Sequence, residues 1–172
     1  MLNIPAAKHA LYQGFDLEIT MELTFLAGNR YLLNGVNGSG KTSLLQKILL
    51  PLLLAHPERQ YIIYLEQQMR GQFLALKAHA ALHEYHHPLV NESDAVEYLL
   101  YDLGHCLQRQ PRPVFLIIDE SVAAQPIRDY WAEHRDSSCL LEVSHGEDQD
   151  HRVWKILQFT LAKVDLAQVK AI

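Results

Sequence analysis

Short apolar runs separated by amphipathic segments dominate the chain. Four of these runs are rich in large apolar and β-branched or aromatic residues, which predicts β-strands. They span residues 30–34, 61–65, 114–118 and 139–143. The run at 114–118 shows no polar alternation, as expected of a strand that is covered on both faces of a parallel sheet.

A different pattern precedes the first of these runs. From Phe15 to Leu26 apolar and polar residues alternate, which is the period of a half-buried strand. Gly28 and Asn29 then turn the chain into the strand at 30–34. We therefore expect an antiparallel hairpin at the N-terminus.

Helical patterns fill most of the remaining chain. Asn91 can cap a helix whose third residue is Asp94, as in a capping box, and Pro88 ends the helix before it. Apolar residues recur at helical spacing along 95–107, which predicts a face turned to the core. The predicted helices span 43–50, 70–87, 91–107 and 127–135.

Together these elements predict an α/β fold. We expect one domain over residues 1–172, with a mostly parallel sheet flanked by helices and a small helical insert at about 69–110. The tail from residue 155 to 172 mixes strand and helix signals and receives no assignment.

Composition narrows the class of protein. The chain has 172 residues, of which 49% are hydrophobic, and a net charge of −5, so we expect a soluble protein and no nucleic-acid partner. The N-terminus lacks the pattern of a signal peptide, and the apolar stretch at 48–55 is too short to span a bilayer. Cys106 and Cys139 have no metal or disulfide spacing. These features predict a cytoplasmic protein, and a peripheral position at the inner face of a membrane is a second expectation.

A phosphate-binding loop stands between the predicted strand at 30–34 and the helix at 43–50. Residues 35–42 fit G-x-x-x-x-G-K-[ST] at every fixed position. In such a loop the backbone N–H groups and the helix N-terminus hold phosphates, Lys41 reaches the outer phosphates, and Thr42 ligates Mg²⁺. The candidate nucleotide-binding residues of the loop are Gly35, Asn37, Gly38, Ser39, Gly40, Lys41, Thr42 and Ser43.

Polar residues follow two further predicted strands. Asp119 and Glu120 come directly after the apolar run at 114–118, and His145 follows the strand at 139–143. The carboxyl ends of parallel strands meet at one edge of a sheet, where α/β proteins bind ligands. Asp119 is placed to hold Mg²⁺, Glu120 to polarise water for attack, and His145 to contact the γ-phosphate of a nucleoside triphosphate.

In this order of motifs the chain resembles the ATP-binding cassette (ABC) ATPases, a family of P-loop NTPases, from residue 12 to about 157. The resemblance implies ATP and Mg²⁺ as cofactors. It implies that Tyr12 stacks on adenine, that Gln67 or Gln68 lies near the metal, and that His145 senses the γ-phosphate. Gly28 matches the glycine that precedes the loop strand in that family.

Two departures from the family concern its dimer. Residues 90–94 lack the glycine pair of the family's signature and carry two carboxylates, which should repel a triphosphate. Pro126 replaces the aspartate that couples the two sites. We therefore expect the symmetric homodimer to be weakened, absent or completed by another ATPase subunit.

Residues 83–87 formally match H-E-x-x-H, a helical pattern that can hold zinc between two imidazoles. Pro88 follows the second histidine directly, which would fray such a helix. A catalytic zinc site and adventitious binding of Zn²⁺ or Ni²⁺ both remain open at this stage, but a solvated helix face is the favoured interpretation.

Two function classes follow. The first is an ATPase that drives a separate membrane permease or another partner. The second is a nucleotide-dependent switch or scaffold with little hydrolysis. A small-molecule kinase would need an arginine-rich lid, and only scattered arginines such as Arg70 and Arg112 are present. The residues alone do not separate adenine from guanine.

Overall fold

The computed structural model describes residues 2–56, 58–144, 154–163 and 166–171. The strands are β1 (Leu2–Ile4), β2 (Ala7–Tyr12), β3 (Phe15–Ile19), β4 (Leu23–Phe25), β5 (Arg30–Asn34), β6 (Tyr61–Leu65), β7 (Val114–Asp119), β8 (Ser138–Ser144), β9 (Trp154–Lys163) and β10 (Leu166–Ala171). The helices are α1 (Lys41–Leu44), the π-helical turn η1 (Leu45–Leu49), α2 (Leu50–Leu54), α3 (Arg70–Leu82), α4 (Glu92–Arg109), α5 (Gln125–Glu133) and the 3₁₀ turn η2 (Arg135–Ser137).

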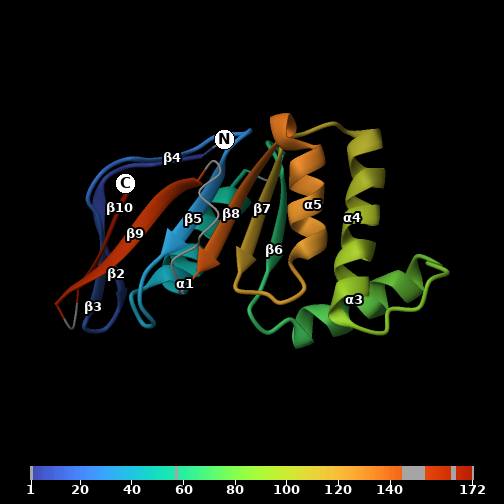
Figure 1. Ribbon diagram of the computed structural model, residues 1–172, viewed down its shortest axis with the longest axis horizontal. Helices are drawn as coiled ribbons and strands as arrows, with labels where there is room; N and C mark the ends of the chain where they lie inside the picture. Colours follow the sequence, from blue (N-terminus) through green and yellow to red (C-terminus); the bar gives the residue numbers. More distant parts are fainter. Residues whose placement is uncertain (1, 57, 145–153, 164–165, 172) are drawn as a thin grey trace.

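One large sheet organises the chain (Figure 1). Its strand order is β2-β3-β10-β9-β5-β8-β7-β6, while β1 and β4 form a separate antiparallel pair. Strands β9, β5, β8, β7 and β6 run parallel to one another, whereas β10 pairs with β9 antiparallel. Strands β2 and β3 form an antiparallel hairpin. The α/β fold, the mostly parallel sheet and the N-terminal hairpin are therefore confirmed.

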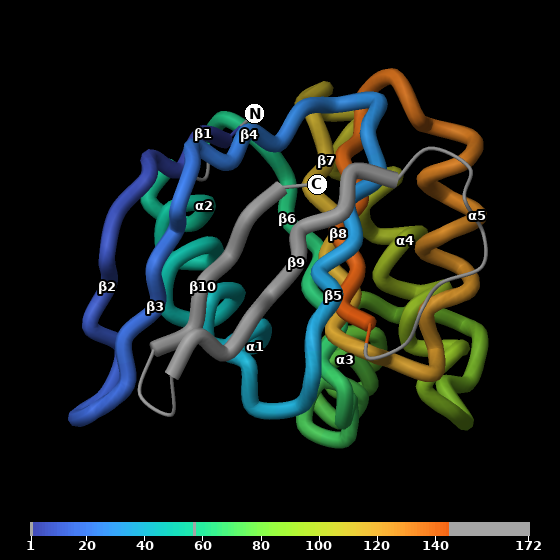
Figure 2. Tube along the Cα trace, turned by 60° about the vertical axis from the view of Figure 1, so that its left-hand side comes forward, coloured from blue at the N-terminus to red at the C-terminus, as the bar shows by residue number. Residues whose placement is uncertain are grey.

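Both faces of the parallel sheet are covered by helices. Phe115 and Ile117 of β7 pack in a cluster with the helix that follows the loop, whereas Leu116 and Ile118 pack in a second cluster with α4 and α5. Helices α4 and α5 lie side by side in Figure 2. Every residue of β7 is consequently buried, which explains its unbroken apolar run.

The register of the parallel strands aligns their carboxyl ends. Asn34, the last residue of β5, pairs with Ser144, the last residue of β8. Asp119, the last residue of β7, pairs with Val143. The residues that leave these strands therefore start from one edge of the sheet, where the sequence predicted a site.

A continuous helix, Lys41–Leu54, follows the loop and includes a π-helical turn. In that turn the amide of Leu50 bonds to the carbonyl of Leu45, five residues earlier. Pro51 lacks an N–H group, and the wider turn just before it lets the helix accommodate the proline. No helix in the described part of the chain is both long and apolar enough to cross a membrane.

Several predicted boundaries are wrong: the helix predicted at 43–50 spans Lys41–Leu54, and the one predicted at 127–135 spans Gln125–Glu133. Two further segments differ more. The alternating segment 15–26 is not one strand, because the exposed residues 20–22 interrupt it and β4 pairs with β1 instead. Helix α3 ends at Leu82 rather than at residue 87, and Glu84 has a left-handed backbone with φ of 53°. A single residue with positive φ ends a helix, but sequence spacing does not reveal it.

The predicted start of α4 is confirmed in detail. The Asn91 side chain accepts a hydrogen bond from the Asp94 amide, and the Asp94 carboxylate accepts one from the Asn91 amide, each at 3.0 Å. Val96 and Leu103 of α4 pack in the core cluster over the sheet, as the helical spacing predicted. A smaller cluster joins α3 to α4 around Tyr98.

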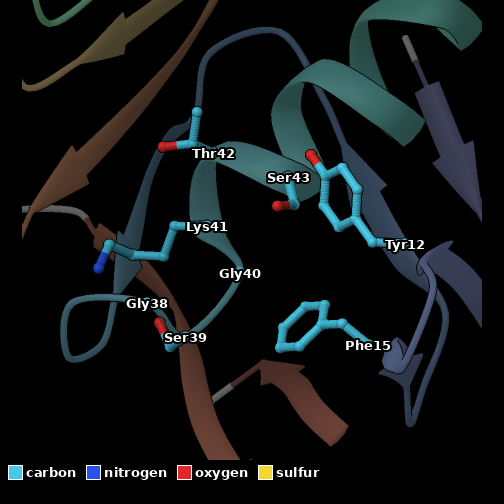
Figure 3. A pocket seen from close by; sticks show the side chains of 8 residues that line it. All are labelled: Tyr12, Phe15, Gly38, Ser39, Gly40, Lys41, Thr42 and Ser43. Atoms are coloured by element: carbon cyan, nitrogen blue, oxygen red, sulfur yellow. The ribbon is translucent and has the colours of Figure 1, made fainter. Parts of the chain in front are cut away.

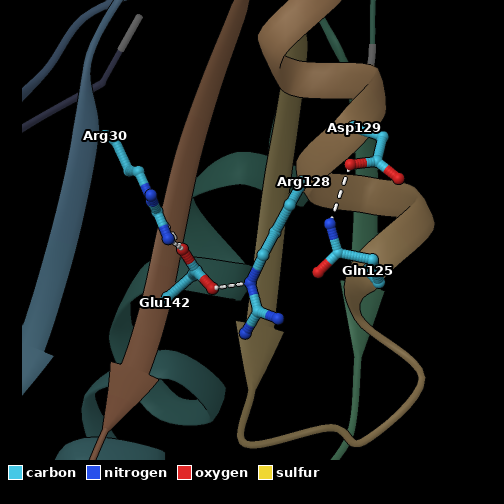
Figure 4. Close-up of polar contacts among 5 residues, drawn as sticks. All are labelled: Arg30, Gln125, Arg128, Asp129 and Glu142. Carbon is cyan, nitrogen blue, oxygen red and sulfur yellow. Dashed lines mark hydrogen bonds and ion pairs between the residues drawn. The ribbon is translucent and has the colours of Figure 1, made fainter. Parts of the chain in front are cut away.

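A buried carboxylate ties three elements together (Figure 4). Glu142 of β8 accepts hydrogen bonds from Arg30 of β5 and from Arg128 of α5, each at 2.7 Å. The Glu142 side chain is 5% exposed. Charge-assisted bonds to both of its oxygens offset the cost of burying this carboxylate.

Candidate nucleotide-binding site

The loop between β5 and α1 has the conformation that its glycines permit. The backbone angle φ is 75° at Gly38 and 98° at Gly40, a region that strains residues with a side chain. The Gly40 carbonyl accepts the Leu44 amide at 2.8 Å, so the helix begins directly at the end of the loop. A helix N-terminus in this position attracts anions.

A pocket of about 300 Å³ opens beside the loop (Figure 3). Its lining residues are Tyr12, Phe15, Gly38, Ser39, Gly40, Lys41, Thr42 and Ser43. Ser39 is buried, and its hydroxyl has no hydrogen-bond partner in the described part of the chain. A buried hydroxyl without a protein partner is expected where a bound ligand completes the site.

Lys41 is buried under the loop. Its Nζ donates hydrogen bonds to the carbonyl oxygens of Gly35, at 2.6 Å, and Val36, at 3.1 Å. Burial lowers the pKa of Lys41, while the carboxylates of Glu120 and Asp119 oppose that shift. The ammonium therefore contacts the phosphate-binding loop and is stabilised in its charged form by the carboxylates of Glu120 and Asp119.

Asp119 is buried at the end of β7 and faces the start of α1. Its carboxylate forms side-chain hydrogen bonds with Thr42 and with Tyr64, whose hydroxyl lies 3.3 Å from Oδ2. Burial raises the pKa of Asp119, and the hydrogen bonds and the Lys41 ammonium only partly oppose it. The two residues predicted to hold Mg²⁺, Thr42 and Asp119, are therefore in direct contact.

Glu120 follows Asp119 with a left-handed backbone, φ 55°, which is rare for a residue with a side chain. Its Oε2 accepts a hydrogen bond from Gln67 Nε2 at 3.0 Å. The structure shows no such contact for Gln68 within the described residues. The segment after β6 thus brings Gln67, of the two candidate glutamines, to the predicted catalytic carboxylate.

Two aromatic rings from the N-terminal hairpin lie across the pocket from Ser39 and Lys41 (Figure 3). Tyr12 is 51% exposed, and Lys47 Nζ lies 5.6 Å from its ring centroid. Phe15 is the cross-strand partner of Tyr12 at the end of the hairpin. Exposed aromatic rings beside a phosphate loop provide flat apolar surfaces on which a base can stack.

Sequence reasoning missed Phe15 and Tyr64 as site residues. Phe15 enters the pocket because the hairpin register places it opposite Tyr12, and that register could have indicated it. Tyr64 belongs to a predicted strand, but its contact with Asp119 depends on the pairing of β6 with β7. His145 lies outside the described residues, so its role stays a prediction.

The H-E-x-x-H motif does not form a helical face. Helix α3 ends before His83, so its spacing no longer places His83 and His87 one turn apart. Within the described residues no group of three or more histidine, cysteine or acidic side chains is arranged to hold a metal ion. The predicted helix at this motif is wrong, and the motif lends no support to a zinc enzyme.

The observed side chains fit a nucleotide phosphate with Mg²⁺. The buried Lys41 ammonium lies under the loop, and the buried Ser39 hydroxyl has no hydrogen-bond partner within the described residues. The Thr42 hydroxyl interacts with the buried Asp119 carboxylate. Hydroxyl and carboxylate oxygens are the ligands that Mg²⁺ prefers. With the loop at the carboxyl edge of a parallel sheet, the chain has the fold of a P-loop NTPase.

No family model matches the chain, and no curated protein matches it. Among solved structures, the chain is similar to C. elegans PCH-2, with 18% sequence identity and a TM-score of 0.41. The similarity covers 77% of this chain and 35% of PCH-2. A likeness this low carries no argument about function, so the functional proposal rests on the geometry of the site.

Proposed function

We propose that the chain is an ATP-binding protein of ABC type that hydrolyses ATP with Mg²⁺. The observation that carries the proposal is that the phosphate loop, with its buried Lys41 bonded to the Gly35 carbonyl at 2.6 Å, lies beside the buried Asp119 at the end of β7, which interacts with Thr42. This arrangement joins the two motifs that P-loop NTPases use to hold the metal on the β- and γ-phosphates. A glycine loop with only a structural role does not require a buried carboxylate beside it.

The proposed roles follow the geometry. Tyr12, aided by Phe15, stacks on the base, and Lys41 exchanges its bonds to the loop carbonyls for bonds to the outer phosphates. Thr42 and Asp119 hold Mg²⁺. The metal neutralises charge on the phosphates when it is bound.

Glu120 is the proposed residue that orients the attacking water. Gln67 Nε2 donates a hydrogen bond to Glu120 Oε2 at 3.0 Å. Asp119, the residue before Glu120, belongs to the proposed metal site. By resemblance to the ABC family, His145 contacts the γ-phosphate. A base of this kind contributes about 10²- to 10⁴-fold to a reaction rate.

The test is the rate of ATP turnover by Glu120→Gln with Mg²⁺. We expect turnover to fall about 10²-fold or more while ATP binding persists. The matched control is Glu97→Gln on the exposed surface of α4, which should hydrolyse ATP like the unmodified chain. Equal turnover by Glu120→Gln and the unmodified chain, with ATP bound, would favour the second candidate, a nucleotide-dependent switch or scaffold.

The structure also bears on the proposed partner. The segment at the place of the family's signature is the capped start of α4, where Asp94 accepts the amides of Val90 and Asn91. These backbone hydrogen bonds lower the pKa of Asp94, which favours its charged form. Amides already used in a capping box, beside a carboxylate, are poorly suited to grip a second nucleotide. We therefore propose that a separate permease or another ATPase subunit completes the working assembly.

A further inference from the structure

Tyr64 connects the metal-binding edge of the sheet to the helix that follows the loop. It lies in β6, half-buried against the core cluster that includes this helix. Its hydroxyl lies 3.3 Å from Asp119 Oδ2 and 3.5 Å from Gln46 Nε2. No sequence motif includes either Tyr64 or Gln46.

The direction of the two hydrogen bonds is set by the groups involved. The Gln46 amide nitrogen only donates, so the Tyr64 oxygen accepts that bond. The proton of the Tyr64 hydroxyl is then left to point to the Asp119 carboxylate, which only accepts. Gln46 of the helix thus orients the Tyr64 hydroxyl, and this hydroxyl in turn donates a hydrogen bond to the Asp119 carboxylate.

The backbone of Tyr64 is held as well. The Gln72 side chain donates to the Tyr64 carbonyl at 2.8 Å and accepts the Glu66 amide at 3.1 Å. Gln72 therefore closes the turn after β6, the turn that also carries Gln67 to Glu120. Tyr64 is therefore held at its backbone by Gln72 and at its hydroxyl by Gln46 and Asp119.

We propose that Tyr64 is a positioning residue that orients Asp119 for Mg²⁺. The inference rests on the proposed function. Thr42 approaches the Asp119 carboxylate from α1 and Tyr64 approaches it from β6, so two neighbouring elements fix one side chain. Hydrogen-bond partners of metal ligands commonly account for 10- to 100-fold in metal affinity, because a ligand held in place loses less freedom on binding.

The chain offers a matched control in the same strand. Tyr61 also lies in β6, and its hydroxyl donates to backbone carbonyls at the end of α4, those of Cys106 and Gln110. Tyr61→Phe and Tyr64→Phe each remove one hydroxyl from the same strand. Only Tyr64→Phe removes a bond to the predicted metal ligand.

The experiment measures equilibrium binding of a fluorescent ATP analogue to each variant, once with Mg²⁺ and once with EDTA. For Tyr64→Phe we expect the gain in affinity that Mg²⁺ confers to shrink about 10-fold, with binding in EDTA unchanged. Tyr61→Phe should match the unmodified chain in both conditions.

Three results would overturn the inference. An unaltered Mg²⁺ effect in Tyr64→Phe would show that the hydroxyl does not orient the ligand. An equal loss of affinity with Mg²⁺ and with EDTA would show a general structural role. If the unmodified chain bound the analogue with no Mg²⁺ effect, or did not bind it, the proposed function would fail together with the inference.

Discussion

At the scale of single residues, Asp119 is a buried charged group whose burial costs folding free energy, unlike the apolar residues of the core. A carboxylate buried at a strand end costs folding free energy unless its partners compensate fully, and the raised pKa of Asp119 shows that they do not. Such a cost is typical of groups kept for binding or catalysis. A bound cation would supply the missing compensation.

The first prediction is that Asp119→Asn raises the melting temperature at pH 7 in metal-free buffer. The folded-state pKa of Asp119 lies above its unfolded value, about 3.9, so the charged carboxylate destabilises the fold above the folded pKa. Below the unfolded value the group is protonated in both states, and the cost disappears. The advantage of the variant should therefore shrink as the pH is lowered through the folded pKa towards 4. Thermal unfolding at both pH values checks this, and a lower melting temperature for the variant at pH 7 would contradict it.

Residues that belong to motifs could be predicted from sequence, whereas their neighbours could not. The spacing of Gly35, Lys41 and Thr42 is local, because one loop and one helix start contain all of them. Tyr64 and Asp119 are 55 positions apart in the sequence and lie on two different strands, yet their side chains form a hydrogen bond. Such a contact depends on strand order, and no local pattern records it.

At the scale of elements, buried strands were easier to predict than helix ends. The run at 30–34 became β5 with the predicted bounds, since a strand covered on both faces tolerates few polar residues. The end of α3 was missed, because nothing local distinguishes residues 83–87 from the helix before them until Pro88. The error in the end of α3 does not affect the predicted site, because α3 contributes no side chain to the pocket beside the loop.

A second prediction tests the ion network that joins β5, β8 and α5. Glu142→Ala should lower the free energy of unfolding by about 3 kcal/mol, because it removes the buried carboxylate that binds both Arg30 and Arg128. Asp16→Ala breaks the exposed pair between Lys8 and Asp16 and should cost less than about 1 kcal/mol. Urea unfolding of both variants measures the difference. Similar small effects would mean that the network adds little to the packing of these elements.

At the scale of the whole molecule, the sheet places the loop, Asp119 and the turn with Gln67 at one edge. Helix α4 begins with a capping box in which both hydrogen bonds are formed. The fold class followed from the order of apolar runs. The strand order did not, because β8 lies between β5 and β7 although it follows both in the chain.

The third prediction concerns solution mass. Glu120→Gln should retain bound ATP, so any pairing that depends on ATP becomes visible in that variant. We expect light scattering to give the mass of one chain with Mg²⁺ and ATP, and the same mass with ADP, because the capping box occupies the amides that would grip a second nucleotide. A doubled mass with ATP alone would show instead that residues 91–94 act as the signature does in the ABC family.

The central claim is that the loop binds ATP through Lys41, and a binding titration tests it most directly. The measurement is the affinity for ATP with Mg²⁺ of the unmodified chain, of Lys41→Met and of the control Lys77→Met on the exposed face of α3. Hydrogen bonds to charged groups contribute about 1.5 to 3 kcal/mol, so Lys41→Met should bind about 10- to 100-fold more weakly, while Lys77→Met binds normally. Equal affinities for all three proteins, or no binding by the unmodified chain, would contradict the account.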